Sequence, residues 1–159
     1  MKTIILVRHS EPQRTASIPN DKIPLSEAGR ILAKTFFAQK IFENPQCVYS
    51  SPYLRAIETA SCLSEKFVVD ERLKERALGD LESLDATFWA KQYENLDFKN
   101  RNGESMNETA CRMDSCIGEV FSKRNSSDIW NVSQTAIVTW AKIILRYCSS
   151  STSSLESAR

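Results

Sequence analysis

The sequence predicts an α/β fold in which a largely parallel β-sheet is flanked by helices. β-prone segments alternate with amphipathic segments along the chain, and residues that cap helices precede several of the amphipathic segments. The first β-prone run is continuously apolar, as in a strand that is covered on both faces. At 159 residues, with 42% hydrophobic and 26% charged residues, the chain has the size and composition of one globular domain.

Four short β-prone segments are the expected strands. The first ends directly at an Arg–His pair, and the third leads into a loop around Gly79. The expected strands are residues 2–7, 47–50, 68–73 and 128–133.

Five segments are expected to be helices. Ser26 and Ser51 stand where they can cap the first two, with Pro52 at the first position of the second. Ser105 and Glu108 have the spacing of a capping box at the start of the fourth. The expected helices are residues 25–42, 50–67, 83–93, 105–123 and 135–148. Apolar residues recur in the first helix at Ile31, Leu32, Phe36, Phe37 and Ile41, which predicts its buried face.

Charge and cysteine content argue against several classes of protein. The formal net charge of +1 gives no sign of a nucleic-acid partner or of an acidic membrane surface. No apolar run approaches the roughly 20 residues of a transmembrane helix. Five scattered cysteines and one histidine do not form a zinc-ligand set, and no cysteine has an arginine six residues later, the spacing of a thiolate phosphatase loop. We expect a cytoplasmic protein with reduced thiols and without a metal or other cofactor.

The candidate site lies at the ends of the first two expected strands. The stretch IILVRHSE places His9 just past the first strand, with Arg8 beside it, and SSPYLRA puts Arg55 in the first turn of the helix after the second strand. In an open α/β sheet ligands collect at the carboxyl ends of the strands. Two arginines and a helix N-terminus beside one imidazole would suit a phosphate dianion, which the imidazole could attack in line.

These motifs resemble those of the histidine phosphatase superfamily, the phosphoglycerate mutase-like proteins. RHSE, LSEAG, SSPYLRA, LKERALGDLE and NGESMNE follow in the family's order, and the resemblance covers roughly residues 2–148. It implies a three-layer sandwich over residues 1–148, with a mostly parallel sheet and a small helical cap at about residues 80–102. The serine-rich residues 149–159 are expected to be a disordered tail.

The resemblance also implies roles for four residues. His9 would be the nucleophile that accepts the phosphoryl group, and Arg8 and Arg55 would clamp the phosphoryl oxygens. Glu75, in LKERALGDLE, would be the acid that protonates the leaving alcohol. Each role answers a requirement of phosphoryl transfer, because the transferred group is negatively charged and an alkoxide is a poor leaving group.

Five further positions stay open at this stage. Asp80 and Glu82 are alternatives to Glu75 for the acid. Ser10 stands where the family usually has glycine, and it either donates a hydrogen bond to phosphate or only fills space. The family's asparagine that follows the RHGE-type motif has no clear match, and Arg14 and Thr15 lie nearby as candidate substrate-binding residues.

The second catalytic histidine of the family has no counterpart in this chain. The resemblance places it in a V-S-H motif at the end of a later strand, where this chain reads NVSQ, with Gln134 in the histidine's place. A glutamine amide keeps a hydrogen bond but carries no positive charge, so we expect an impaired enzyme. The alternative is a misalignment, in which Gln134 is simply a polar residue at a strand end.

The C-terminal end and the function leave alternatives open. Related chains continue with a further strand after the last helix, so the C-terminal edge strand is expected to be missing, and the chain could be a monomer or a homodimer. The favoured function is hydrolysis of a small organic phosphate monoester through a phosphohistidine on His9, with activity impaired by Gln134. The alternative is a catalytically weak or inactive module that binds a small phosphorylated ligand, and a phosphoglycerate mutase is less favoured because the cap is small.

Overall fold

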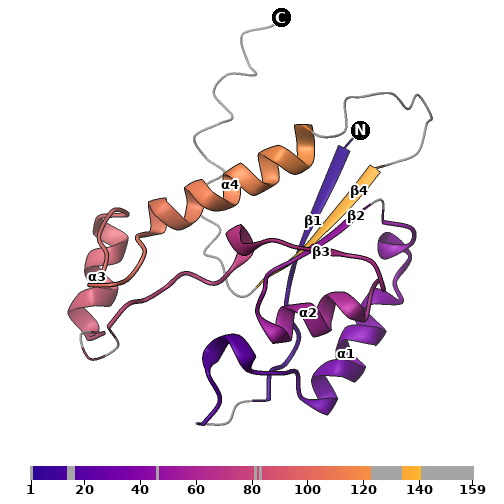
Figure 1. The fold of residues 1–159 in the computed structure, drawn as a ribbon, viewed down its shortest axis with the longest axis horizontal. Coiled ribbons are helices and arrows are strands. Elements are labelled where there is room, and N and C mark those ends of the chain that lie inside the picture. The colour runs from indigo at the N-terminus through magenta and orange to yellow at the C-terminus, as the bar shows by residue number, and fades with distance from the viewer. Residues whose placement is uncertain are drawn as a thin grey trace, which may run out of the picture.

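The computed structural model describes residues 2–140 except 14–16, 46, 81, 83 and 123–133. Its strands are β1 (Lys2–Arg8), β2 (Cys47–Ser50), β3 (Val68–Val69) and β4 (Gln134–Trp140), and its helices are α1 (Glu27–Phe37), α2 (Leu54–Ser61), α3 (Ala86–Glu94) and α4 (Met106–Ser122). The strands form one parallel sheet in the order β1-β4-β2-β3 (Figure 1). The predicted α/β fold with a parallel sheet is confirmed. The expected loss of a C-terminal edge strand concerns residues that lie outside the described ones.

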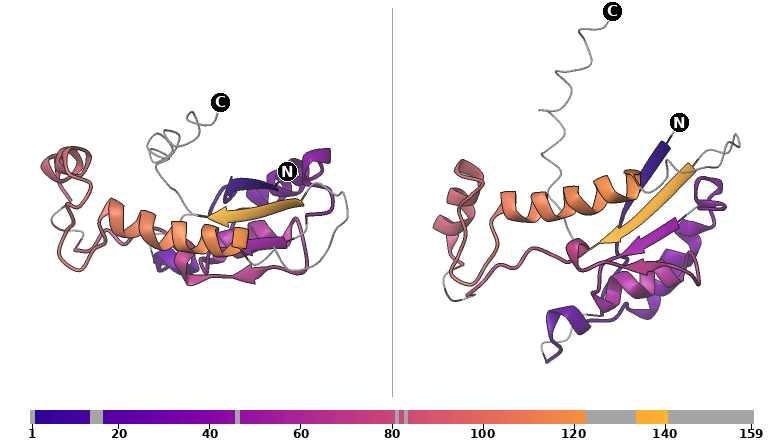
Figure 2. Two further views of the ribbon diagram at one scale, coloured as in Figure 1. Left: turned by 90° about the horizontal axis from the view of Figure 1, so that it is seen from above. Right: turned by 45° about the horizontal axis from the view of Figure 1, so that its top comes forward.

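Helices cover both faces of the sheet, which gives three layers. α4 lies along one face, and α1 and α2 lie on the other (Figure 2). Neighbouring residues of β1 point to opposite faces, as the period of two of a strand requires. Ile4 packs against the buried cluster that includes Met113 of α4, whereas Ile5 packs against the cluster that includes Phe37 of α1. The apolar run of β1 is therefore explained by burial on both sides.

Two of the predicted helix caps are present as expected. The Ser26 hydroxyl accepts a hydrogen bond from the N–H of Gly29 at 2.9 Å and caps α1. At the start of α4 the Ser105 hydroxyl accepts from the N–H of Glu108 at 3.0 Å, and the Glu108 carboxylate accepts from the N–H of Ser105 at 2.9 Å. This reciprocal pair is the predicted capping box, and it fixes the point at which α4 begins.

The predicted start of α2 is wrong. The helix begins at Leu54, and its N-cap position is Tyr53, which makes no side-chain cap. Ser51 instead uses its hydroxyl in the turn before the helix, where it accepts from the N–H of Tyr53 at 3.4 Å. Pro52 therefore lies in that turn and not in the first helical turn.

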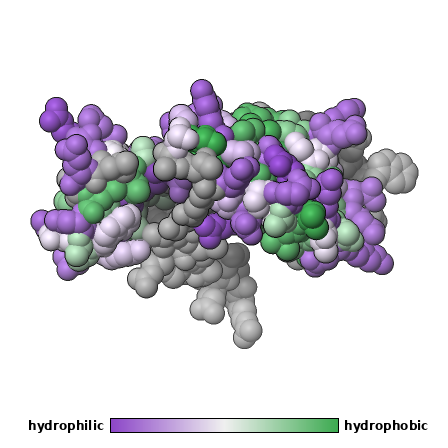
Figure 3. Space-filling view, turned by 90° about the horizontal axis from the view of Figure 1, so that it is seen from below, coloured by the Kyte–Doolittle hydropathy of each residue, from purple (hydrophilic) through white to green (hydrophobic). Residues whose placement is uncertain are grey.

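The buried face of α1 also differs from the prediction. The buried stripe is Gly29, Ala33 and Phe37, at the four-residue spacing of one helix face. The small residues allow the helix to lie against the backbone near Glu11, because a Cβ at Gly29 would stand 2.2 Å from the Glu11 carbonyl oxygen. The other residues predicted to be buried are exposed, namely Ile31, Leu32, Phe36 and Ile41. On the face drawn in Figure 3, apolar surface forms separate patches within hydrophilic surface.

The final predicted helix is wrong over its described part. Residues 134–140 form the strand β4, which pairs with β1 on one side and with β2 on the other. Central parallel strands are commonly apolar in sequence, and a short apolar run such as residues 136–138 cannot be told from part of a buried helix by periodicity alone. The strand predicted over residues 128–133 lies outside the described residues. The strand predicted over 68–73 is β3 for two residues and then the 3-10 helix Glu71–Leu73.

The segment predicted to form a cap, at about residues 80–102, lies at the N-terminal end of α4, away from the sheet (Figures 1 and 2). Its helix α3, predicted over 83–93, is capped by the Asp85 carboxylate, which accepts from the N–H of Phe88 at 2.8 Å. The loop after α3 returns beside the segment that leads into the cap, where the N–H of Asp80 donates to the carbonyl of Arg101. None of the helices within the described ranges has the length and apolar content needed to cross a membrane.

Candidate active site

Three of the predicted site residues lie at the carboxyl edge of the sheet, the edge at which the parallel strands end. They follow β1, β2 and β3, the first three strands along the chain. His9 directly follows β1, and Arg55 is the second residue of α2, which follows β2. Glu75 lies in an extended segment two residues after the 3-10 helix that follows β3. A parallel sheet therefore brings together residues that are far apart in the sequence.

Arg55 and Glu75 form an ion pair at the centre of this site. Arg55 Nη2 donates to Glu75 Oε2 at 2.7 Å, and the Arg55 side chain is only 5% exposed. Asn20 braces both groups, because its carbonyl accepts from Arg55 Nη1 at 2.5 Å and its amide donates to Glu75 Oε2 at 3.3 Å. The guanidinium also lies over the ring of Tyr53, 4.7 Å from its centroid. The predicted clamp and the predicted acid are therefore in direct contact.

The ring of His9 is held in one orientation by the backbone. Its Nδ1 lies 2.6 Å from the Ser10 carbonyl oxygen, which can only accept, so Nδ1 carries the proton. In the neutral ring the lone pair is then on Nε2. Partial burial lowers the pKa of His9 below its usual 6.5, and the charges of Arg55 and Arg8 lower it further, whereas the Ser10 carbonyl and Glu75 act in the opposite direction. The neutral imidazole is thus favoured near pH 7.

The loop that carries His9 is tied to α2 by Thr59, a residue that sequence reasoning missed. The Thr59 hydroxyl accepts from the N–H of Ser10 at 3.1 Å and donates to the Arg55 carbonyl at 2.7 Å. Its position four residues after Arg55 on a helix was the signal that could have indicated it. The Ser10 hydroxyl is buried and has no hydrogen-bond partner within the part of the chain that the structure describes.

The remaining candidates lie farther out or outside the described residues. Arg8 is the last residue of β1 and is exposed. Asp80 is exposed and accepts from the Asn102 amide at 3.0 Å in the cap, and Glu82 is also exposed. Of the three carboxylates weighed for the acid, Glu75 is the one seen on Arg55. Arg14 and Thr15 lie outside the described residues.

The register of β4 contradicts the predicted place of Gln134. Gln134 is the first residue of β4 and pairs with Lys2, whereas the last residue, Trp140, pairs with Arg8. Because strands rise by about 3.3 Å per residue, the two ends of this strand are about 20 Å apart. Gln134 therefore lies at the edge of the sheet opposite to His9. The strand end beside the site, where the resemblance places the second histidine, carries Trp140.

Comparison with known proteins assigns the family. The Histidine phosphatase superfamily (branch 1) matches residues 4–150 of this chain. The chain belongs to the histidine phosphatase superfamily. The predicted resemblance is thereby confirmed, and the α/β architecture is the one found in solved members of this superfamily. Among the described residues, no group of three or more His, Cys, Asp or Glu side chains could hold a metal ion.

Individual members of the histidine phosphatase superfamily that resemble the chain are named as phosphatases. "Putative phosphoserine phosphatase 2" of Hydrogenobacter thermophilus is 34% identical over 101 residues, which cover 57% of this chain and 47% of the relative. The match thus spans about half the length of that protein. A mycobacterial glucosyl-3-phosphoglycerate phosphatase in complex with inorganic phosphate has a TM-score of 0.69, with 24% identity and coverage of 86% of this chain and 70% of that chain. An alpha-ribazole phosphatase from Shigella flexneri has a TM-score of 0.65, with 19% identity and coverage of 87% and 73%.

Proposed function

We propose that the chain is a phosphatase that hydrolyses a small organic phosphate monoester through a phosphohistidine on His9. The observation that carries this proposal is the arrangement of His9, Arg55 and Glu75: an imidazole with its Nδ1 proton engaged by a carbonyl stands within electrostatic reach of a buried guanidinium and its carboxylate partner. The phosphate esters named for the relative and the structural neighbours support a small ester as the substrate class.

In the first step, the lone pair on His9 Nε2 attacks the phosphorus atom in line with the bond to the leaving oxygen. The new bond is N–P, and the bond that breaks joins phosphorus to the alcohol oxygen. Arg55 and Arg8 neutralise charge on the equatorial oxygens, and Glu75 transfers a proton to the leaving oxygen. Glu75 is ion-paired with Arg55 in the free chain, and in this step it must hold the proton that it gives to the leaving oxygen.

In the second step, water replaces the alcohol. Glu75, now a carboxylate, takes a proton from the water as its oxygen attacks the phosphohistidine. The N–P bond breaks, inorganic phosphate forms, and the neutral imidazole returns with its Nδ1–H still donating to the Ser10 carbonyl. The Ser10 hydroxyl has no hydrogen-bond partner among the described residues, which supports a role for Ser10 as a hydrogen-bond donor to phosphate, in place of the glycine of the resembling proteins.

Trp140 suggests that the activity is weak. An indole offers one neutral N–H donor, whereas a protonated imidazole at this strand end would offer positive charge to the phosphoryl group. Loss of one preorganised donor commonly costs about 10²-fold to 10³-fold in rate. The same observation supports the second candidate function, a module that binds phosphorylated ligands without turning them over, because the arginines and His9 are all retained.

The test is hydrolysis of para-nitrophenyl phosphate at slightly acid pH by the purified protein and by His9→Ala, Trp140→His and Gln134→His. We expect slow turnover that His9→Ala abolishes and that Trp140→His raises about tenfold or more. Gln134→His is the matched control: it introduces the same side chain into the same strand at the opposite edge, and should leave the rate unchanged.

Two outcomes would contradict the phosphatase. Turnover that survives His9→Ala would show that the activity comes from another group or another protein. Absence of turnover in both the wild-type chain and Trp140→His, together with binding of inorganic phosphate by calorimetry, would establish the binding module instead. If Gln134→His and not Trp140→His raised the rate, the placement of the strand end would be wrong.

A further inference from the structure

An arginine of α4 holds the backbone of the segment that carries Glu75. Arg112 donates from Nη1 to the carbonyl oxygens of Arg72 at 2.6 Å and Lys74 at 2.9 Å, and from Nη2 to the carbonyl oxygen of Glu75 at 3.4 Å. Arg72 lies in the short 3-10 helix Glu71–Leu73, and Lys74 and Glu75 follow it outside any helix or strand, so the Lys74 and Glu75 carbonyls lack the partners that a sheet or helix would provide. One guanidinium thus supplies hydrogen bonds to three carbonyls in four residues.

Glu104 holds the same segment from its other end. Its carboxylate accepts from Arg112 Nε and Nη2, both at 2.8 Å. This bidentate arrangement fixes the orientation of the carboxylate relative to the guanidinium. The Glu104 oxygen Oε2 also accepts from the N–H of Ala77 at 3.0 Å, and the N–H of Glu104 donates to the Ala77 carbonyl at 2.8 Å. The hydrogen bonds from Arg112 keep the pKa of the Glu104 carboxyl below its usual range. Arg112 and Glu104 therefore act on both sides of Glu75 along the chain.

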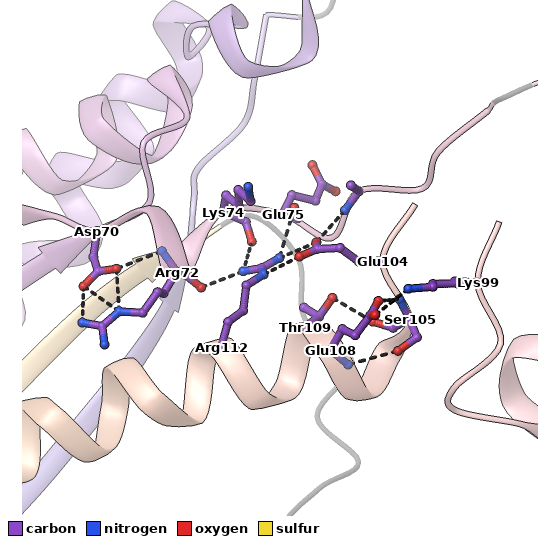
Figure 4. Close-up of polar contacts among 11 residues, drawn as sticks. Asp70, Arg72, Lys74, Glu75, Lys99, Glu104, Ser105, Glu108, Thr109 and Arg112 are labelled. Atoms are coloured by element: carbon purple, nitrogen blue, oxygen red, sulfur yellow. Dashed lines mark hydrogen bonds and ion pairs between the residues drawn. The ribbon is translucent and has the colours of Figure 1, made fainter. Parts of the chain in front are cut away.

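The backbone and the side chain of Glu75 face in different directions. Figure 4 shows Arg112 rising from α4 toward the segment, while the carboxylate of Glu75 points away from Arg112. That carboxylate meets Arg55 of α2, which lies on the other side of the sheet from α4. The position of the carboxylate thus depends not only on Arg55 but also on the hydrogen bonds that Arg112 and Glu104 make to the backbone around Glu75.

We propose that Arg112 and Glu104 are a positioning pair that sets the place of Glu75 for proton transfer to the leaving group. The inference rests on the proposed function, in which Glu75 is the acid. Both side chains are largely buried, at 16% and 22% exposed, so the pair is only weakly screened by solvent. A general acid acts only within hydrogen-bond reach of the leaving oxygen, and a displacement of about 1 Å is enough to reduce the rate strongly.

The test uses the dependence of rate on the leaving group. An acid matters most when the leaving alcohol is poor, so glycerol phosphate and para-nitrophenyl phosphate are compared by kcat/KM, which covers the steps up to the transfer to His9. We expect Arg112→Lys to lose about tenfold or more on glycerol phosphate and only a few-fold on para-nitrophenyl phosphate, as Glu75→Gln does. Glu104→Gln should show the same pattern with a smaller loss.

Arg72→Lys is the matched control. Arg72 also pairs with α4, through Glu119 at 2.6 Å, but its side chain bonds Asp70 and not the carbonyls around Glu75. We expect this variant to change both substrates by the same factor. Equal losses on the two substrates in Arg112→Lys would overturn the positioning role and leave a purely structural one.

A second readout does not need turnover. If Arg112 positions Glu75, the shifts in the urea midpoint caused by Arg112→Lys and Glu75→Gln will not add in the double variant, because the first substitution already weakens the Arg55–Glu75 pair. Arg72→Lys and Glu75→Gln should add. An inactive wild-type chain with this non-additivity would refute the proposed phosphatase and keep the positioning contact, whereas additive shifts in both pairs would refute the positioning contact.

Discussion

The two edges of the sheet share the same strands and differ in the residues that follow or precede them. At the carboxyl edge, His9, Arg55 and Glu75 come within electrostatic reach of one another from three separate segments. At the opposite, amino edge, β1 and β4 begin side by side with Lys2 and Gln134. Two residues near the same strand can therefore have different roles: only a residue at the carboxyl end of the strand lies where it can take part in the chemistry.

The largest expected effect separates the two edges directly. Replacing His9 with asparagine removes the nucleophile, and we expect phosphatase activity to fall by about 10³-fold or more. Lys2→Ala, at the amino edge of the same strand, should leave kcat/KM within about twofold of wild type. Both are measured with para-nitrophenyl phosphate. Comparable losses in the two variants would mean that the fold, and not the chemistry of the carboxyl edge, had been damaged.

Adding a second histidine to Trp140→His sharpens the comparison within β4. We expect the double variant Trp140→His/Gln134→His to be as active as Trp140→His alone, about tenfold or more above wild type. The reason is that the two positions are about 20 Å apart, so only one imidazole can reach a phosphoryl group on His9. Initial rates at saturating substrate provide the measurement. A double variant more active than Trp140→His would show that the amino edge contributes to turnover.

A third prediction concerns a residue at the carboxyl edge that is expected to stabilise the fold and to have no part in catalysis. Asp70 directly follows β3, and hydrogen bonds from Arg72 lower its pKa from 3.8 to about 2. Since the folded form has the lower pKa, the contribution is complete above about pH 4 and is lost as the pH falls toward 2. Asp70→Asn should therefore lower the free energy of unfolding by about 1 to 2 kcal/mol at pH 7.

Urea unfolding of Asp70→Asn and wild type from pH 7 down to pH 2 is the matching measurement. The difference between the two stabilities should shrink from about pH 4 toward pH 2, where Asp70 is protonated in the unfolded chain and about half protonated in the folded chain. Their kcat/KM values at pH 7 should agree within about twofold, because Asp70 contacts Arg72 and not Arg55. A constant stability gap across the pH range would point to lost packing instead of a lost ion pair.

The smallest expected effect is a shift in the titration of His9. The chain has one histidine, so its ring signals in an NMR titration are unambiguous. We expect a pKa below 6.5, and a higher pKa in Arg55→Met, because Arg55 disfavours a second positive charge. Lys2→Met at the amino edge should not change the pKa of His9. A fall of that pKa in Arg55→Met would show that burial outweighs the charge at this position.

The sequence was sufficient where a local rule decides the structure. Capping at Ser26 and the capping box of Ser105 and Glu108 follow from hydrogen bonds within four residues, and both were predicted. That Arg55 and Glu75 belong to one site was implied only by the resemblance, because their contact depends on the order of the strands in the sheet, which no local pattern shows.

Where several local patterns were possible, the sequence was not sufficient. The short apolar run in the sequence of β4 is as typical of a buried helix as of a strand, and the wrong choice between them moved the expected strand end from Trp140 to Gln134. In α1 the buried stripe contains the small residues Gly29 and Ala33 beside Phe37, whereas the other large apolar residues are exposed, because this face of the helix lies close to the backbone at Glu11. Thr59 carried no motif and became visible only through its two hydrogen bonds.

The position of β4 in the sheet has a consequence for how the protein is made. β4 is the last of the described strands to leave the ribosome, yet it lies between β1 and β2, the first two. Until residue 140 has emerged, β1 lacks its parallel partner and β2 is paired only with the two-residue β3. The nascent chain therefore carries unpaired strand edges until residue 140 has emerged, and the described sheet closes in one insertion whose contacts are all far apart in sequence.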